Sequence, residues 1–329
     1  MSKPFNPKIA RRESPSRFSM GLPVLIWLIL SACNSQNQGI VSLNELPQNR
    51  ADYQSVMVAE LSGHQTLPDG SKMVSRWSAD GRAQAKDYLK ARLEELGLTA
   101  REHNYKAPNL SPAIDLILNP FKGSNVYAVL PATEESNEYV VLGAHYDTGK
   151  RGAPGAIDNA TGIALIYSVL KELTQTDQRA RNVMVVFFDQ EEEELIGSQA
   201  FAGWLADTDW EVHSVHCFDM VGWDSNGDWA METFSPNEQL SELYRQVAQK
   251  RGIPLFQKAI NPVGFEVGAT DFDAFVLPGF SVIGAGECYY HGDSSPYKDT
   301  PEDTYETVNF DYLLSCTQLV EEVIKSIVI

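Results

Sequence analysis

Acidic side chains and one histidine follow four short apolar or glycine-rich stretches of this chain. They are His145, Asp147, Asp158, Glu191, Glu192 and Asp219. Imidazole nitrogen and carboxylate oxygen atoms are ligands of zinc, and a hydrolytic zinc pair also needs a bridging carboxylate and a nearby base that is not a ligand. These residue types would supply such a site if the four segments converged in the fold.

Strand and helix patterns alternate along the chain and would position these residues. Strands are expected over 125–130, 138–144, 182–188, 212–221 and 279–284, and helices over 78–96, 161–173, 194–205, 236–251 and 309–329. The alternation predicts an α/β fold with a mostly parallel mixed sheet and helices on both faces. Ligands bind such sheets at the carboxyl ends of the strands, where His145, Glu191 and Asp219 fall. Because three separate segments agree, we interpret them as one site.

The neighbours of these residues suggest how the roles are divided. Asp158 lies in a Gly/Asn-rich loop that could turn its carboxylate toward two ions. Glu191 and Glu192 are adjacent, so one could bind metal while the other accepts a proton. Asp147 could hold the second nitrogen of the His145 imidazole. Taken singly, each acid could be a turn residue or part of a solvated helix start, but the joint pattern favours the metal site.

The composition limits the partners and the fold. The formal net charge is -18 and no basic stripe is visible, so nucleic acid is not an expected partner. Beyond Cys33, three cysteines remain, and this odd number does not suit a disulfide scaffold. With 329 residues, of which 43% are hydrophobic, the chain can bury a full core.

The beginning of the chain reads as a targeting segment. Basic residues precede a short apolar run at 21–30, which continues into Leu-Ser-Ala-Cys and resembles a bacterial lipobox. We therefore predict a lipoprotein signal peptide over 1–32, lipidation of Cys33, a polar tether over 33–50 and one domain over 51–329. The lipid would anchor an exported protein in the cell envelope membrane, and in the outer membrane if the organism is Gram-negative. An ordinary signal peptide with an incidental cysteine is the alternative.

Together the motifs resemble metallopeptidase family 28. These co-catalytic zinc exopeptidases include bacterial leucyl aminopeptidases and aminopeptidase Y. The resemblance begins near Ser78 and extends to the C-terminus, and it implies a zinc-exopeptidase-like fold for the domain, which would be the catalytic domain. The matching stretches are 144–147, 155–159 with Gly162, 188–198, 218–222 and 300–304.

The resemblance also implies a set of ligands for two zinc ions. His145, Asp158 and Asp219 would hold one ion, and Asp158, Glu192 and one further residue would hold the other. Glu191 would be the general base. The family often has a cis peptide bond after the bridging aspartate, so the bond after Asp158 is a candidate.

One departure from the family pattern leaves the last ligand open. The family usually has a histidine just before the Thr-Pro-x-Asp-Thr stretch, and here that position is Asp299. His291, eight residues earlier, has the expected residue type but not the expected position. Either residue could complete the second site, or the second site could be weak and the enzyme could use one zinc. Phe272 is a second departure, because it stands where the family usually has histidine.

The resemblance implies a hydrolase that acts on peptides with a free N-terminus, most simply an aminopeptidase. Water activated by the metals would attack the peptide bond, with Glu191 as general base. A carboxypeptidase of the same family, a glutaminyl-peptide cyclase with one zinc, and a non-catalytic surface-binding module on the same fold are the alternatives. Four aromatic residues could line a side-chain pocket, although packing in the core or in loops is the simpler explanation: Trp223, Phe265, Tyr289 and Tyr290.

Overall fold

The computed structural model describes residues 50–106, 122–262 and 270–329. The predicted signal peptide, the lipidation site Cys33 and Phe265 lie outside these residues, as does the predicted tether except Arg50. Within the described residues, no helix combines the length and the apolarity that a membrane crossing requires.

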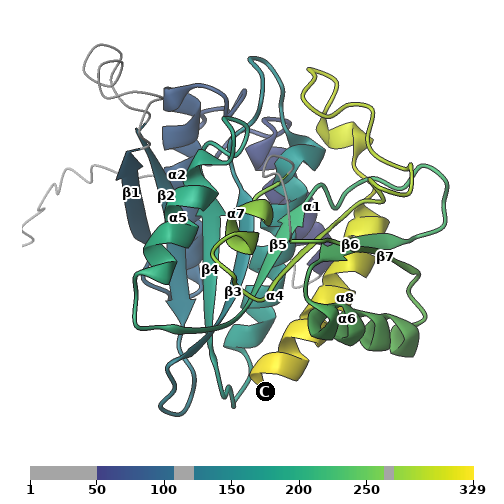
Figure 1. The fold of residues 1–329 in the computed structure, drawn as a ribbon. Helices are drawn as coiled ribbons and strands as arrows, with labels where there is room; N and C mark the ends of the chain where they lie inside the picture. Colours follow the sequence, from purple (N-terminus) through teal and green to yellow (C-terminus); the bar gives the residue numbers. More distant parts are fainter. Residues whose placement is uncertain (1–49, 107–121, 263–269) are drawn as a thin grey trace, which may run out of the picture. The chain divides into compact units, whose positions relative to one another are not determined.

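The strands form one mixed sheet of eight strands in the described parts of the chain, in the order β1-β2-β4-β3-β5-β8-β6-β7 (Figure 1). β3 runs parallel to β4 and β5, β5 to β8, and β6 to β7, whereas β1–β2, β2–β4 and β6–β8 are antiparallel. The predicted α/β fold with a mostly parallel mixed sheet is therefore confirmed. The strands are β1 (Arg101–Lys106), β2 (Lys122–Leu130), β3 (Glu138–His145), β4 (Asn182–Phe188), β5 (Glu211–Asp219), β6 (Met231–Ser235), β7 (Leu255–Ala259) and β8 (Val282–Gly286).

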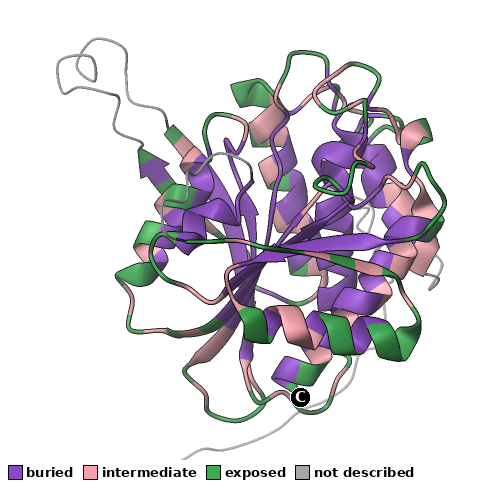
Figure 2. Cartoon of the chain, turned by 45° about the vertical axis from the view of Figure 1, so that its right-hand side comes forward, coloured by how far each residue is buried: buried purple, intermediate pink, exposed green. Residues whose placement is uncertain are grey.

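Helices cover both faces of the sheet. α1, α2, α4, α6 and α8 contribute to one hydrophobic core, and α5 and α7 contribute to the other. Figure 2 shows the buried strands between these layers. The helices are α1 (Arg50–Leu61), α2 (Ala79–Glu95), α4 (Thr161–Thr174), α5 (Ile196–Ala206), α6 (Glu238–Arg251), α7 (Asp273–Val276) and α8 (Phe310–Val328).

The central strand β4 shows why both faces need a cover. All seven of its residues are buried. Val183, Val185 and Phe187 join one core, and the alternate residues Met184 and Val186 join the other. Successive side chains of a strand point to opposite faces, so a continuously apolar strand requires helices on each side.

Local signals set the start and the end of α2, the helix predicted over 78–96. The Ser78 hydroxyl accepts a hydrogen bond from the Gly81 backbone N–H at 3.1 Å and caps the first turn. Gly97 follows the helix with φ 77°, a conformation that glycine adopts without a steric penalty.

Candidate metal centre

Three of the predicted ligands meet at the carboxyl edge of the sheet. His145 is the last residue of β3 and Asp219 is the last residue of β5, its parallel neighbour. The His145 Nε2 atom lies 3.1 Å from Asp158 Oδ1 and 3.3 Å from Asp219 Oδ1. One potential ligand atom of each residue lies within 4.8 Å of those of the other two. Strand ends thus bring together side chains that are far apart in the sequence.

The loop before α4 fixes the position of Asp158. The peptide bond between Asp158 and Asn159 is cis, as expected from the family resemblance. Both oxygens of Asp303 accept backbone hydrogen bonds, from Ile157 N–H at 2.8 Å and from Asp158 N–H at 3.0 Å. The Asn159 side chain donates to the Phe218 carbonyl at 2.8 Å, next to Asp219. These bonds tie the loop to the strand that carries another predicted ligand.

Asp158 also belongs to a second cluster, with Glu192 and Asp299. Potential ligand atoms of these three residues lie within 4.8 Å of one another. A Cβ atom on Gly149 would lie 2.1 Å from Asp299 Oδ1 and 2.7 Å from Glu192 Oε2, so a larger residue would displace these carboxylates from their present positions. Asp158 is common to this cluster and to the cluster with His145 and Asp219, which is the position a bridging carboxylate requires. A third group of potential ligand atoms, which does not contain Asp158, consists of His145, Glu191 and Glu192.

His291, the alternative to Asp299 as last ligand, lies elsewhere. Its Nδ1 atom is 2.5 Å from Glu232 Oε1, and its ring stacks on Phe256 with the ring centroids 4.3 Å apart. Among the described residues, His291 belongs to none of the clusters that could hold a metal ion. Of the two candidates, the structure brings Asp299 to the site.

Asp147 connects the histidine to the paired glutamates. Its Oδ1 atom lies 3.5 Å from His145 Nδ1 and accepts the Glu191 backbone N–H at 3.0 Å. Its Oδ2 atom accepts the Glu192 backbone N–H at 3.3 Å. Asp147 therefore lies beside the imidazole and holds the backbone of the turn from which both glutamates project.

The charges and the unpaired oxygen atoms of this site fit divalent cations. Burial, followed by the charge of Asp158, raises the pKa of Glu192 to about 9. Burial alone would lower the pKa of His145, but Glu191 and the other nearby carboxylates raise it well above its usual range. Among the described residues, the buried atoms Asp158 Oδ2 and Asp299 Oδ1 have no hydrogen-bond partner. One imidazole and several crowded carboxylates form a donor set that zinc accepts.

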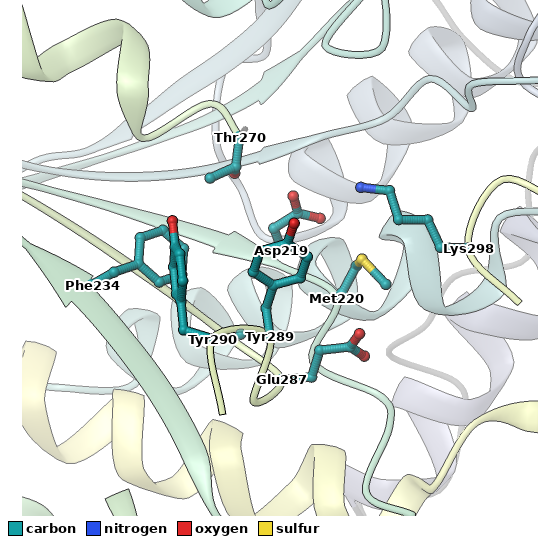
Figure 3. Close-up of a pocket in the computed structure, with 9 residues that line it drawn as sticks. Asp219, Met220, Phe234, Thr270, Glu287, Tyr289, Tyr290 and Lys298 are labelled. Carbon is teal, nitrogen blue, oxygen red and sulfur yellow. The ribbon is translucent and has the colours of Figure 1, made fainter. Parts of the chain in front are cut away.

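A pocket of about 260 Å³ adjoins the cluster at Asp219. Figure 3 shows the rings of Phe234, Tyr289 and Tyr290 on one side of this pocket and Lys298 on the other. Tyr289 and Tyr290, two of the aromatic residues that the sequence suggests for a side-chain pocket, both line it. Trp223 is not among its lining residues; the indole N–H instead donates to Asp293 at 3.1 Å.

Sequence reasoning missed two buried acids beside the site. Glu287 lines the pocket, is 3% exposed and directly follows β8, so the rule about strand ends would have found it. Asp271 is 2% exposed, and its charge acts on Glu191 and Asp219. Burial raises the pKa of each of these two acids to about 8. Both extend the acidic character of the site beyond the predicted residues.

A third residue that the sequence did not reveal is Arg76, whose side chain is fully buried. It donates hydrogen bonds to the carbonyl oxygens of Leu61, Tyr146, Pro154 and Gly155 at 2.6 to 2.9 Å. One guanidinium thus connects α1, the end of β3 and the loop that leads to Asp158. Its five donors in a rigid plane suit this task, which a lysine ammonium cannot reproduce.

Replacing Arg76 with lysine is therefore expected to lower the free energy of unfolding by about 3 kcal/mol, because buried carbonyl oxygens lose charged donors. Equilibrium unfolding in urea would measure the difference in free energy of unfolding between the variant and the wild-type protein. The matched control is Arg245→Lys, on the exposed side of α6, where 47% of the arginine side chain is exposed. If both variants were equally stable, Arg76 would not hold these segments together.

Comparison with known proteins gives the family. Residues 125–324 match the model of Peptidase family M28, which is more than half of the chain. A probable leucine aminopeptidase of Trichophyton verrucosum is 27% identical over 218 residues, which cover 61% of this chain and 56% of that protein. The chain thus spans just over half the length of this curated relative.

Solved structures share the fold. A zinc aminopeptidase of Bacillus subtilis superposes with a TM-score of 0.71 at 14% identity, over 86% of this chain and 96% of that one. A glutaminyl cyclase of Bacteroides thetaiotaomicron superposes with a TM-score of 0.65 at 18% identity, over 84% and 98%. At this level of identity the likeness concerns the fold, whereas the match to the family model covers the segments that form the site. On that match, the chain belongs to peptidase family M28.

Proposed function

We propose that this protein is a zinc-dependent exopeptidase, specifically an aminopeptidase that releases the N-terminal residue of peptides. The observation that carries the proposal is the carboxylate of Asp158, shared by two clusters of potential ligand atoms at the carboxyl edge of the sheet. Such an arrangement suits two metal ions that act together on one peptide bond. The family match and the curated relative support the same reaction class.

In this proposal two zinc ions bind per chain. His145, Asp158 and Asp219 would hold one ion, and Asp158, Glu192 and Asp299 would hold the other. When bound, zinc lowers the pKa of water and polarises the peptide carbonyl. Asp147, whose Oδ1 atom lies 3.5 Å from His145 Nδ1, would hold the ring and thereby set the direction of its ligating nitrogen.

Glu191 is the proposed general base. It is 8% exposed, its backbone N–H is held by Asp147, and one of its oxygens lies within 4.8 Å of potential ligand atoms of His145 and Glu192. Glu191 forms a third group of potential ligand atoms with His145 and Glu192, but both of these residues are assigned to the two ions that share Asp158, so the carboxylate of Glu191 would stay available as a base. Glu191 would take a proton from the attacking water and deliver it to the leaving amine.

The acidic surroundings suit a substrate with a free amino group. Asp219 and Glu287 both line the pocket beside the proposed ligands, and Asp271 lies close by. Burial and the nearby carboxylates of Asp158 and Asp219 raise the pKa of Glu287, and a positively charged α-ammonium group beside it would favour its ionised form and bind there. An N-acetylated peptide lacks that charge and would bind more weakly.

A panel of aminoacyl amides tests the proposal, with each amide compared to its N-acetylated form. We expect hydrolysis of the free-amine substrates and little hydrolysis of the acetylated ones. Equal hydrolysis of both forms would reject the aminopeptidase. An N-terminal glutamine peptide belongs in the same panel, because its cyclisation without amide hydrolysis would identify a glutaminyl-peptide cyclase instead. A binding module would give neither product.

We also propose that Cys33 is lipidated and anchors the exported protein in the cell envelope. The support is the lipobox-like sequence that ends at Cys33. Cys33→Ala is expected to move the protein from the membrane fraction to the soluble fraction and to abolish labelling by a fatty acid, because the acyl chains supply the membrane affinity. Ser35→Ala is the matched control. Labelling that persists in Cys33→Ala would disprove lipidation at this residue.

A further inference from the structure

The loop that carries Tyr289 and Tyr290 forms one wall of the pocket beside Asp219 (Figure 3). A hydrogen bond joins the two ends of this loop: the Asp293 backbone N–H donates to the Cys288 carbonyl at 3.0 Å. The two tyrosines are 62% and 43% exposed. Packing against the core therefore fixes their rings only in part, and their positions depend on the backbone of the loop.

A buried carboxylate on β6 holds the middle of this loop. Glu232 is fully buried, and its Oε2 atom accepts the Tyr290 backbone N–H at 2.7 Å. Its Oε1 atom lies 2.5 Å from His291 Nδ1. A buried carboxylate is costly unless it is hydrogen-bonded, so folding favours the loop conformation that supplies both partners.

Ring contacts complete the attachment of the loop. The His291 ring lies flat on Phe256 of β7, with the ring planes 13° apart. The rings of Tyr290 and Phe234 of β6 pack edge to face with their centroids 5.9 Å apart, and Lys258 Nζ lies 5.5 Å from the centre of the Tyr290 ring. The loop is thus docked on β6 and β7, at the end of the sheet beyond β8.

We propose that Glu232 and His291 are positioning residues that set the shape of the pocket for the N-terminal side chain of the substrate. They act through Tyr289 and Tyr290, whose rings form the pocket wall. This inference rests on the proposed aminopeptidase function and adds that the aromatic wall of the pocket beside Asp219 receives that side chain. Binding of substrates with large apolar N-terminal side chains therefore depends on Glu232 and His291, because these side chains reach the aromatic wall. Binding of alanine substrates does not, because the alanine side chain is too short to reach it.

His291→Phe tests the inference, because phenylalanine keeps a ring to stack on Phe256 but cannot bond to Glu232. The matched control is His213→Phe, at an exposed position of β5. We expect KM for leucine and phenylalanine amides to rise about 10-fold in His291→Phe, with kcat unchanged, since uniform binding of the side chain is lost. KM for alanine amide and the zinc content should match the control variant.

Glu232→Gln serves as the conservative variant, because its amide oxygen can still accept the Tyr290 N–H and its amide nitrogen can donate to a neutral imidazole. It should retain more of the selectivity for large side chains than His291→Phe. A loss of kcat and zinc in His291→Phe would instead assign His291 to the metal site. Unchanged selectivity would show that the pair does not shape the pocket.

If the wild-type protein hydrolyses no amide, the proposed aminopeptidase function is wrong, but the positioning role of Glu232 and His291 can still be tested. Backbone amide exchange over residues 287–293 then reports on the loop directly. Faster exchange at Tyr290 in His291→Phe than in His213→Phe would support the positioning role. Equal exchange in the two variants would overturn it.

Discussion

Replacing Glu191 with glutamine is expected to lower kcat by about 1,000-fold, the usual contribution of general acid–base catalysis. Glutamine has nearly the shape of glutamate and keeps the backbone hydrogen bond to Asp147, so the geometry of the turn is preserved. It cannot accept the proton of water. The zinc content should stay at the wild-type value, because in the proposed arrangement both ions are held by the two clusters that share Asp158, and Glu191 is in neither of them.

Steady-state hydrolysis of leucine amide and metal analysis of the same sample would measure this. Glu193→Gln is the matched control, because Glu193 lies in the same acidic segment and is exposed. Near-normal turnover of Glu191→Gln would remove Glu191 as the base. A parallel loss of zinc would make it a ligand.

Asp158→Asn is expected to weaken zinc binding more than 100-fold, because losing a bridging ligand should exceed the roughly 10- to 100-fold cost of losing a partner that only orients a ligand. Asparagine can keep the backbone bonds to Asp303, since these come from the peptide N–H groups. It cannot supply two anionic oxygens to two ions. Activity should fall with the metal.

Equilibrium dialysis against zinc would give the affinity and the number of ions bound. Asp209→Asn is the control, because it removes the same charge at an exposed position. Full occupancy of both zinc sites in Asp158→Asn would rule out the bridging role.

The central part of the fold was predictable because its apolar pattern is strong. β4 has the bounds expected from its continuous apolar run, and α2 and α4 begin and end within a residue or so of their predicted limits. These elements are buried on several sides, so burial and sequence pattern agree.

The elements at the margins of the sheet were not predicted. β1 is an edge strand in which Tyr105 is the one buried residue, so it shows no clear alternation. β6 is buried throughout but contains Glu232, Thr233 and Ser235, and its sequence does not look like an interior strand. Glu232 finds its partners in Tyr290 and His291, about 58 residues later in the chain. A local sequence pattern cannot reveal such long-range compensation.

The residues of the candidate site likewise fall into some that the sequence indicated and some that only the fold could identify. Strand ends indicated His145, Glu191 and Asp219, because parallel neighbours end at the same edge of the sheet. The choice between Asp299 and His291 needed the fold, since residue type favoured one and position favoured the other. Glu232 binds His291 and holds it away from the candidate metal centre. That contact depends on β6, which the sequence did not reveal.

Titrating the metal-free protein with zinc while following leucine amide hydrolysis would test the zinc-dependent mechanism most directly. We predict that activity is absent after chelation, returns as zinc is added and reaches its maximum at two ions per chain. Full hydrolysis by the metal-free protein would contradict the zinc-dependent mechanism.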